Sequence, residues 1–288
     1  MCILDGTGRL LARKVEDRPI FVVGGSRSGT SVLLHALGKH RRIYSFNGED
    51  PFITDIGGMM YNLEYADQRE LDYYLSSLQV PQAYIARQLR KLAYESAFGY
   101  HYGLRSMLRD SLKGGFNPFT KTHWCVKTFP VRIVADGLLK LYPLARFVMI
   151  HRSGIDVVNS RSKFHAFKEL DFRKQCEEWS QSVADFAYLA EFEQGIAVRH
   201  ADLVDDPETV FRRIQTFLGL DYDPAPADFT STNQIHPLAS VENQANVDVR
   251  TQMSKRAPVH ESWTPQQRQI FAEICGQAMG RLGYSLPF

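Results

Sequence analysis

The sequence predicts an α/β fold in which a parallel sheet is flanked by helices. Short apolar runs typical of buried strands alternate along the chain with longer segments of helical spacing. A Gly-rich turn directly follows the first predicted strand, as expected where a strand leads into a helix. The 288 residues contain no obvious linker, so we expect one domain over 1–288.

The predicted strands are short and apolar, and the clearest is 146–150. They lie at 20–23, 43–46, 124–126, 146–150 and 196–198. Predicted helices cover 31–37, 132–142, a segment from about 154, 170–193, 207–218 and 265–281. The stretch about 55–120 is predicted as a helical insertion, and 221–262 is rich in Pro and Asn and irregular.

Composition excludes several classes of protein. Hydrophobic residues make up 44% and charged residues 23%, which argues against a disordered, collagen-like or coiled-coil chain. Lys and Arg total 34 against 32 Asp and Glu, a net charge of +2, and no dense basic stripe stands out. We therefore expect no nucleic acid partner, and any anionic ligand must be held by a few placed groups.

The cysteines and the N-terminus favour a soluble protein of the cytoplasm. The four cysteines are far apart in the sequence and form no Cys-x-x-Cys pair, which argues against a zinc cluster and against a disulfide scaffold. They are Cys2, Cys125, Cys176 and Cys275. Arg and Lys interrupt the first apolar run, unlike a signal peptide. No run approaches the ~18 apolar residues of a membrane-spanning helix, so we expect no transmembrane segment.

The segment from Gly24 to Thr30 carries the first chemical signal. Its strand–turn–helix setting presents backbone N–H groups and a helix N-terminus to an anion. Gly24 and Gly29 match the spacing of the nucleoside-triphosphate loop G-x-x-x-x-G-K-[ST], but Thr30 replaces the lysine and Arg27 supplies the cation. His151 and Arg152 follow the strand 146–150, where a magnesium-binding Asp is absent. We predict a P-loop-like nucleotide-binding fold without a metal.

An arginine and a serine provide the second signal. Arg152 directly follows a buried strand, and Ser160 lies eight residues later, about two turns into the next helix. Ligands of parallel sheets gather at the carboxyl ends of the strands. An arginine fork and a hydroxyl there form a seat for a second phosphate.

These segments resemble the sulfotransferase family, whose donor is 3′-phosphoadenosine 5′-phosphosulfate (PAPS). Arg27-Ser28-Gly29-Thr30-Ser31 looks like the family's 5′-phosphosulfate loop, and Arg152-x7-Ser160 like its 3′-phosphate element. Similarity continues at His200–Glu208, Phe217–Leu220 and Leu282–Tyr284, and so covers most of the chain. The style is closest to the tyrosylprotein and heparan branch, although we expect no membrane anchor of the kind that this branch carries.

The resemblance implies donor-binding roles for eight residues. They are Arg27, Ser28, Gly29, Thr30, Ser31, Arg152, Ser160 and His200. His200 replaces the tyrosine that the family places near the adenosine, and Ser153-Gly154 replaces Asp-Pro. The family's late basic loop over the 3′-phosphate is only loosely echoed by Lys255 and Arg256, and the contact is not assigned to either.

The resemblance also implies catalytic roles for Lys127 and Glu49. Lys127 follows an apolar strand and is expected to support the leaving oxygen, as the lysine of this family does. Phe129 stands where the cytosolic branch has its histidine base, so Glu49, as in the tyrosylprotein branch, is the expected base. Asp50 and His123 are the alternatives.

The expected reaction moves a sulfuryl group from PAPS to a hydroxyl or amine of a small-molecule, carbohydrate, lipid or peptide acceptor. Adenosine 3′,5′-bisphosphate (PAP) is the second product. Two alternatives use the same loop: a nucleotide or small-molecule kinase, and a non-catalytic nucleotide-binding module. Thr30 in the lysine position opposes the first, and Glu49 with Lys127 opposes the second.

Overall fold

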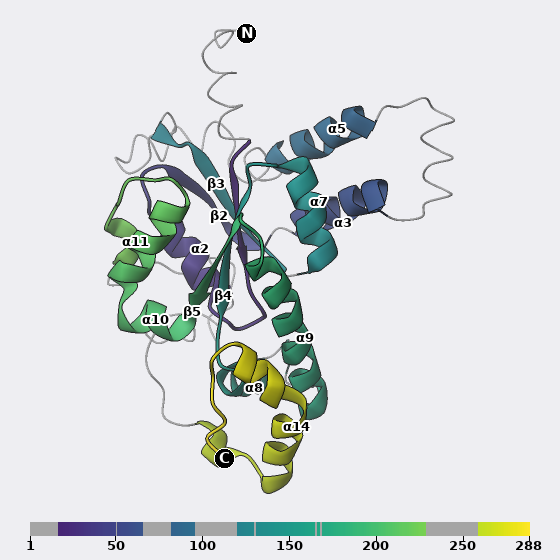
Figure 1. Cartoon of the computed structure of the whole chain (residues 1–288), viewed down its shortest axis with the longest axis vertical. Coiled ribbons are helices and arrows are strands. Elements are labelled where there is room, and N and C mark those ends of the chain that lie inside the picture. Colours follow the sequence, from purple (N-terminus) through teal and green to yellow (C-terminus); the bar gives the residue numbers. More distant parts are fainter. Residues whose placement is uncertain are drawn as a thin grey trace.

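The fold is known from a computed structural model, which describes residues 17–49, 51–65, 82–95, 120–129, 131–164, 166–167, 169–228 and 259–288. Its centre is one sheet of five parallel strands in the order β2-β3-β1-β4-β5 (Figure 1). The strands are β1 (Pro19–Val23), β2 (Ile43–Glu49), β3 (His123–Thr128), β4 (Arg146–His151) and β5 (Gly195–Arg199). The predicted parallel α/β sheet is confirmed.

Alternate side chains of the inner strands β3, β1 and β4 enter different hydrophobic clusters. In β1, Ile20 and Val22 belong to the cluster on one face, and Phe21 and Val23 to the cluster on the other. All five residues of this strand are buried. The continuous apolar run therefore reflects a strand covered on both faces, as is usual for parallel sheets.

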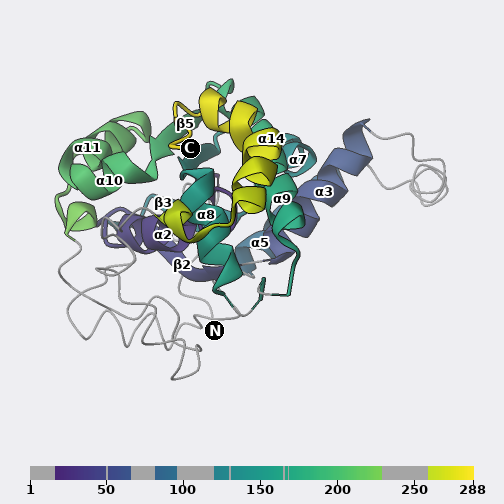
Figure 2. The ribbon, with the colours of Figure 1, turned by 90° about the horizontal axis from the view of Figure 1, so that it is seen from below.

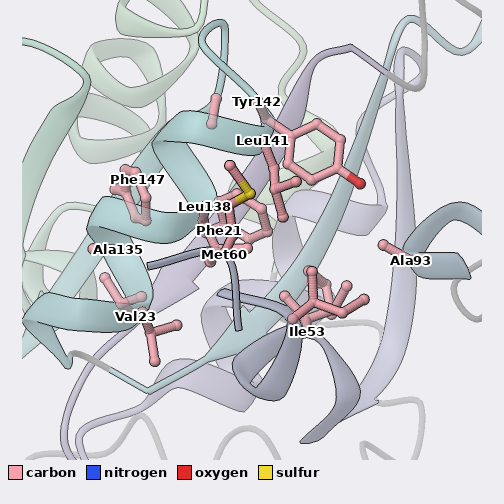
Figure 3. Packing of buried hydrophobic residues seen from close by; sticks show 14 of the residues in the cluster. Phe21, Val23, Ile53, Met60, Ala93, Ala135, Leu138, Leu141, Tyr142 and Phe147 are labelled. Atoms are coloured by element: carbon pink, nitrogen blue, oxygen red, sulfur yellow. The ribbon is translucent and has the colours of Figure 1, made fainter. Parts of the chain in front are cut away.

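Two groups of helices cover the two faces, and Figures 1 and 2 show them on opposite sides of the molecule. One group comprises α2 (Thr30–Gly38), α10 (His200–Asp205) and α11 (Pro207–Phe217). The other comprises α3 (Pro51–Tyr65), α5 (Gln82–Glu95) and α7 (Arg132–Leu141). This second cluster is built around aromatic rings, and Figure 3 shows Phe21 between Tyr142 and Phe147.

A third cluster lies beyond the sheet, where α8 (Gly154–Ser162), α9 (Phe172–Ala190) and α14 (Pro265–Arg281) pack together. Two short 3₁₀ helices, Ala225–Ala227 and Val259–Ser262, complete the described elements. Asp171 begins α9 by accepting hydrogen bonds from the Arg173 and Lys174 amides, and Thr264 begins α14 in a capping box. No helix within the described ranges is long and apolar enough to cross a membrane.

Element boundaries differ from the predicted ones mainly near the strand ends. β2 continues to Glu49, which pairs with Lys127 of β3, and β3 continues to Thr128, which pairs with Val23 of β1. The helices α10 and α3 lie where no helix of those bounds was predicted. α3 overlaps the start of the predicted insertion and α5 lies within it, and most of the remaining insertion lies outside the described residues.

Candidate functional site

The carboxyl ends of β2, β3, β1 and β4 bring the predicted functional residues to one edge of the sheet. The loop after β1 lies between the ends of its two neighbours, β3 and β4. Lys127 is paired with Val22, one residue before the end of β1. Arg152 follows β4 directly. The edge therefore collects cationic side chains around the loop, as expected for an anion site.

The loop is shaped by close contacts that leave no room for side chains. A Cβ on Gly24 would lie 2.4 Å from the carbonyl oxygen of Ile150. Gly29, which precedes α2, has a φ of 101°, and a Cβ there would lie 2.8 Å from Cδ2 of His200. No side chain caps the start of α2. The backbone amides of its first turn therefore face the concavity that the loop forms.

Arg27 is held in place by two contacts from α8 and the segment after it. Its Nε donates to Oγ of Ser160 at 3.2 Å, and its guanidinium lies 4.5 Å from the ring centre of Phe164. Its φ of 68° is unusual for a residue with a side chain. The structure thus joins two predicted donor-binding residues that are 133 positions apart.

Lys127 and Ser31 form a second link between predicted residues. The Lys127 Nζ donates to Oγ of Ser31, in the first turn of α2, at 3.3 Å. Ser28 and Thr30 are buried in the loop itself. In the sheet, Glu49 is the strand partner of Lys127, next to a shift in the β2–β3 register. The register therefore brings the two predicted catalytic positions together.

Of the alternative bases, His123 lies at the wrong end of its strand. It begins β3 and pairs with Ile43, the first residue of β2, whereas Lys127 lies near the end of β3. Burial, followed by the positive charge of Arg18, lowers the pKa of His123 to about 4. Its position argues against a role in the reaction. Asp50, Lys255 and Arg256 lie outside the described residues.

Arg152 lies just before α8 and Ser160 lies within it, and the two residues have different partners: Asp156 for Arg152, and Arg27 for Ser160. The Arg152 Nε lies 3.6 Å from Oδ2 of Asp156, in the first turn of α8. Asp156 and Ser160 are four residues apart and therefore share a helix face. The Arg152 side chain is 14% exposed, so its cation is partly shielded from solvent.

Tyr284 and Arg199, neither of which was predicted as a site residue, support the ends of β4 and β5. The Tyr284 hydroxyl lies 3.3 Å from Nδ1 of His151, and the Arg199 guanidinium lies 4.6 Å from the Tyr284 ring centre. His151 precedes Arg152, and Arg199 precedes His200, which is buried against Gly29. The C-terminal segment after α14 therefore braces both strand ends that carry predicted donor-binding residues.

A cavity of about 470 Å³ adjoins the loop on the side of α9. Gly25 and Ser26 line it at the loop, and Phe129 and Val131 line it after β3. Its volume lies within the range of small-molecule sites in proteins. Sequence spacing gave no sign of this cavity, because α9 is distant in the chain from both other walls.

We expect Gly29→Ala to destabilise the protein and to weaken anion binding. The methyl group would force a strained backbone and displace His200, at a cost of about 1–3 kcal/mol in the free energy of unfolding. Urea denaturation measures this change. Gly58→Ala in α3 is the matched control, because nothing lies within 4 Å of its added Cβ. Equal stability of the two variants would contradict the strained geometry.

Comparisons with known proteins agree with this geometry. The sulfotransferase family matches residues 19–224, a range that includes every predicted donor-binding and catalytic residue. No curated protein sequence matches the chain significantly. The family match spans more than half of the chain, and it confirms the predicted class of enzyme.

Several solved structures share the fold at low sequence identity. The sulfotransferase domain of the Synechococcus PCC 7002 olefin synthase is 18% identical, with a TM-score of 0.58 over 94% of this chain and 96% of that one. The sulfotransferase domain of the curacin biosynthetic pathway is 14% identical, with a TM-score of 0.52 over 93% and 98%. Mouse sulfotransferase SULT7A1, solved in complex with PAP, is 14% identical, with a TM-score of 0.53 over 93% and 86%. The chain belongs to the sulfotransferase family.

Proposed function

We propose that this sulfotransferase uses PAPS as its donor and that the edge formed by the phosphate loop, Lys127 and Glu49 carries out the transfer. The observation that supports this most is the Lys127–Ser31 contact, which places an ammonium group at the start of α2, beside the loop. One of the structures that share the fold was solved with PAP. The roles proposed below for the donor-binding and catalytic residues rest on where each residue lies at this edge.

The loop and α2 would bind the 5′-phosphosulfate. Amides of the loop, with Ser28, Thr30 and Ser31 around them, donate hydrogen bonds to its oxygens, and the positive end of the α2 dipole favours its charge. Arg27 adds a cation that Ser160 and Phe164 keep in place. The glycines are required because any Cβ at Gly24 or Gly29 would meet neighbouring atoms.

The 3′-phosphate would lie against Arg152 and Ser160. Arg152 offers a guanidinium that is mostly shielded from solvent, which strengthens an interaction with phosphate. Ser160 contributes a hydroxyl from the same side of α8 as Asp156. His200 would contact the adenosine. It is the first residue of α10, directly after β5, and its ring lies beside Gly29.

In the transfer, Glu49 takes the proton from the acceptor hydroxyl or amine as that atom forms a bond to sulfur. The bond between sulfur and the bridging oxygen breaks, and the electron pair stays on the 5′-phosphate of PAP. Lys127 stabilises the negative charge that develops on this oxygen. The donor and the acceptor together supply every atom of the two products. The acceptor itself, whether small molecule, carbohydrate, lipid or peptide, would approach from the cavity beside Gly25 and Ser26.

A calorimetric titration tests the donor assignment. We expect PAP to bind without Mg²⁺, and ATP and ADP to bind more weakly with or without the metal. Thr30 stands in place of the P-loop lysine, and His151-Arg152 stands at the end of β4 in place of an acidic residue; both oppose a kinase. Tighter binding of ATP with Mg²⁺ than of PAP would contradict the proposal. Mass spectrometry for a sulfated acceptor separates an enzyme from a binding module.

We expect Arg152→Ala to weaken PAP binding by about 10- to 100-fold, because a charge-assisted hydrogen bond is lost. Binding of adenosine 5′-monophosphate, which lacks the 3′-phosphate, should change little. Arg146→Ala is the control, since Arg146 begins the same strand at the opposite edge of the sheet. An equal loss of affinity for both nucleotides would show that Arg152 does not bind the 3′-phosphate.

A further inference from the structure

The cavity beside the phosphate loop has two walls of different chemistry. Phe129 and Val131, after β3, form an apolar wall, and both side chains are more than a third exposed although they are large and hydrophobic. Exposed apolar side chains that border a cavity gain free energy when an apolar ligand covers them. This wall therefore suits the carbon skeleton of an acceptor.

A second wall of the cavity is the polar face of α9. Glu177, Gln181 and Asp185 line the cavity and recur every four residues, so they stand in one row along the helix. From Glu177 to Asp185 the helix rises about 12 Å, which is the length of a medium-sized ligand. The row consists of two carboxylates and one amide. It lines the same cavity as Gly25 of the phosphate loop.

Both cations that line the cavity are already paired. Lys174 lies 3.8 Å from Oε2 of Glu177, and Arg161 donates to Oε2 of Glu178. Asp185 takes part in none of the ion pairs found within the described ranges. Burial raises the pKa of its carboxyl group, and a hydrogen bond from Gln181 opposes that shift. A partly desolvated carboxylate of this kind is stabilised when a cation binds next to it.

We infer that the cavity binds acceptors that carry a protonated amine, with Asp185 as the residue that selects for that charge. The inference rests on the proposed function, because it takes the cavity as the place from which the acceptor reaches the loop. The apolar part of the acceptor lies against Phe129 and Val131, and its ammonium group lies at the Asp185 end of the α9 row. An acceptor with a carboxylate in that place is repelled.

The test compares three phenols of matched shape: 2-(4-hydroxyphenyl)ethylamine, 4-ethylphenol and 4-hydroxyphenylacetate. Their affinities are measured by calorimetry on the full chain, with and without saturating PAP. We expect the amine to bind about tenfold more tightly than the neutral phenol, and the carboxylate to bind most weakly. Asp185→Asn keeps the shape of the side chain and should bring the amine and the neutral phenol to equal affinity.

Glu191→Gln is the matched control, since it removes one carboxylate from the end of the same helix, away from the cavity. It should leave the order of the three affinities unchanged. Any other order in the wild-type chain, or binding of none of the three, would overturn the inference, as would a preference that survives in Asp185→Asn. PAP affinity is measured in the same titrations, so a failure of the donor assignment is seen separately.

Discussion

Replacing Glu49 with glutamine is expected to lower turnover by about 10²- to 10⁴-fold, the usual contribution of a general base. Glutamine keeps the shape of the side chain but cannot take the proton of the acceptor. PAP affinity should stay nearly constant, because in the proposed reaction Glu49 acts on the acceptor and not on the nucleotide. The measurement is turnover at saturating PAPS, with PAP affinity as the control for folding.

His123→Ala provides the comparison for this experiment. His123 lies at the amino ends of the strands, at the other end of β3 from Lys127, so its loss should leave most of the turnover. If the turnover of Glu49→Gln lies within a few-fold of the wild-type value, Glu49 is not the base. If His123→Ala instead loses activity while PAP affinity is intact, His123 and not Glu49 would be the base, and the reaction would not take place at the carboxyl ends of the strands.

The fold was predictable because its strongest signals are local. Apolar runs such as 146–150 stand out in a chain whose strands are covered on both faces, and Gly24 and Gly29 mark a turn with specific backbone requirements. The ends of β2 and β3 were harder to predict. Glu49 and Lys127 are polar, and it is strand pairing that keeps them in the sheet: Glu49 pairs with Lys127, and Lys127 also pairs with Val22 of β1.

The parts of the site that depend on tertiary contacts were beyond sequence reasoning. Nothing near Arg27 in the chain indicates that Phe164 lies under its guanidinium, or that Tyr284 reaches His151 from the C-terminal segment. The sequence also left His123 as a candidate base, because the residues around it mimic a family motif. Strand register separates such cases, since it fixes the edge of the sheet at which each residue lies.

Replacing Lys127 with methionine tests the other half of the reaction. Methionine fills a similar volume but carries no charge, so it cannot stabilise the oxygen that leaves sulfur. Loss of one such donor typically costs about 10²- to 10³-fold in turnover. The Ser31 hydroxyl also loses the ammonium group that contacts it, so PAP affinity is expected to change, but by less than turnover. Single-turnover measurements at saturating PAPS isolate the transfer step.

Lys140→Met is the matched control, because Lys140 is an exposed lysine in the last turn of α7, away from the loop. It removes the same charge and should leave both turnover and PAP affinity near the wild-type values. The acceptor's acidity gives a sharper outcome: a phenol with a more acidic hydroxyl depends less on the base, Glu49, but still needs charge stabilisation on the departing oxygen. More acidic phenols should therefore partly rescue Glu49→Gln but not Lys127→Met. Equal rescue of the two variants would show that their roles are not divided in this way.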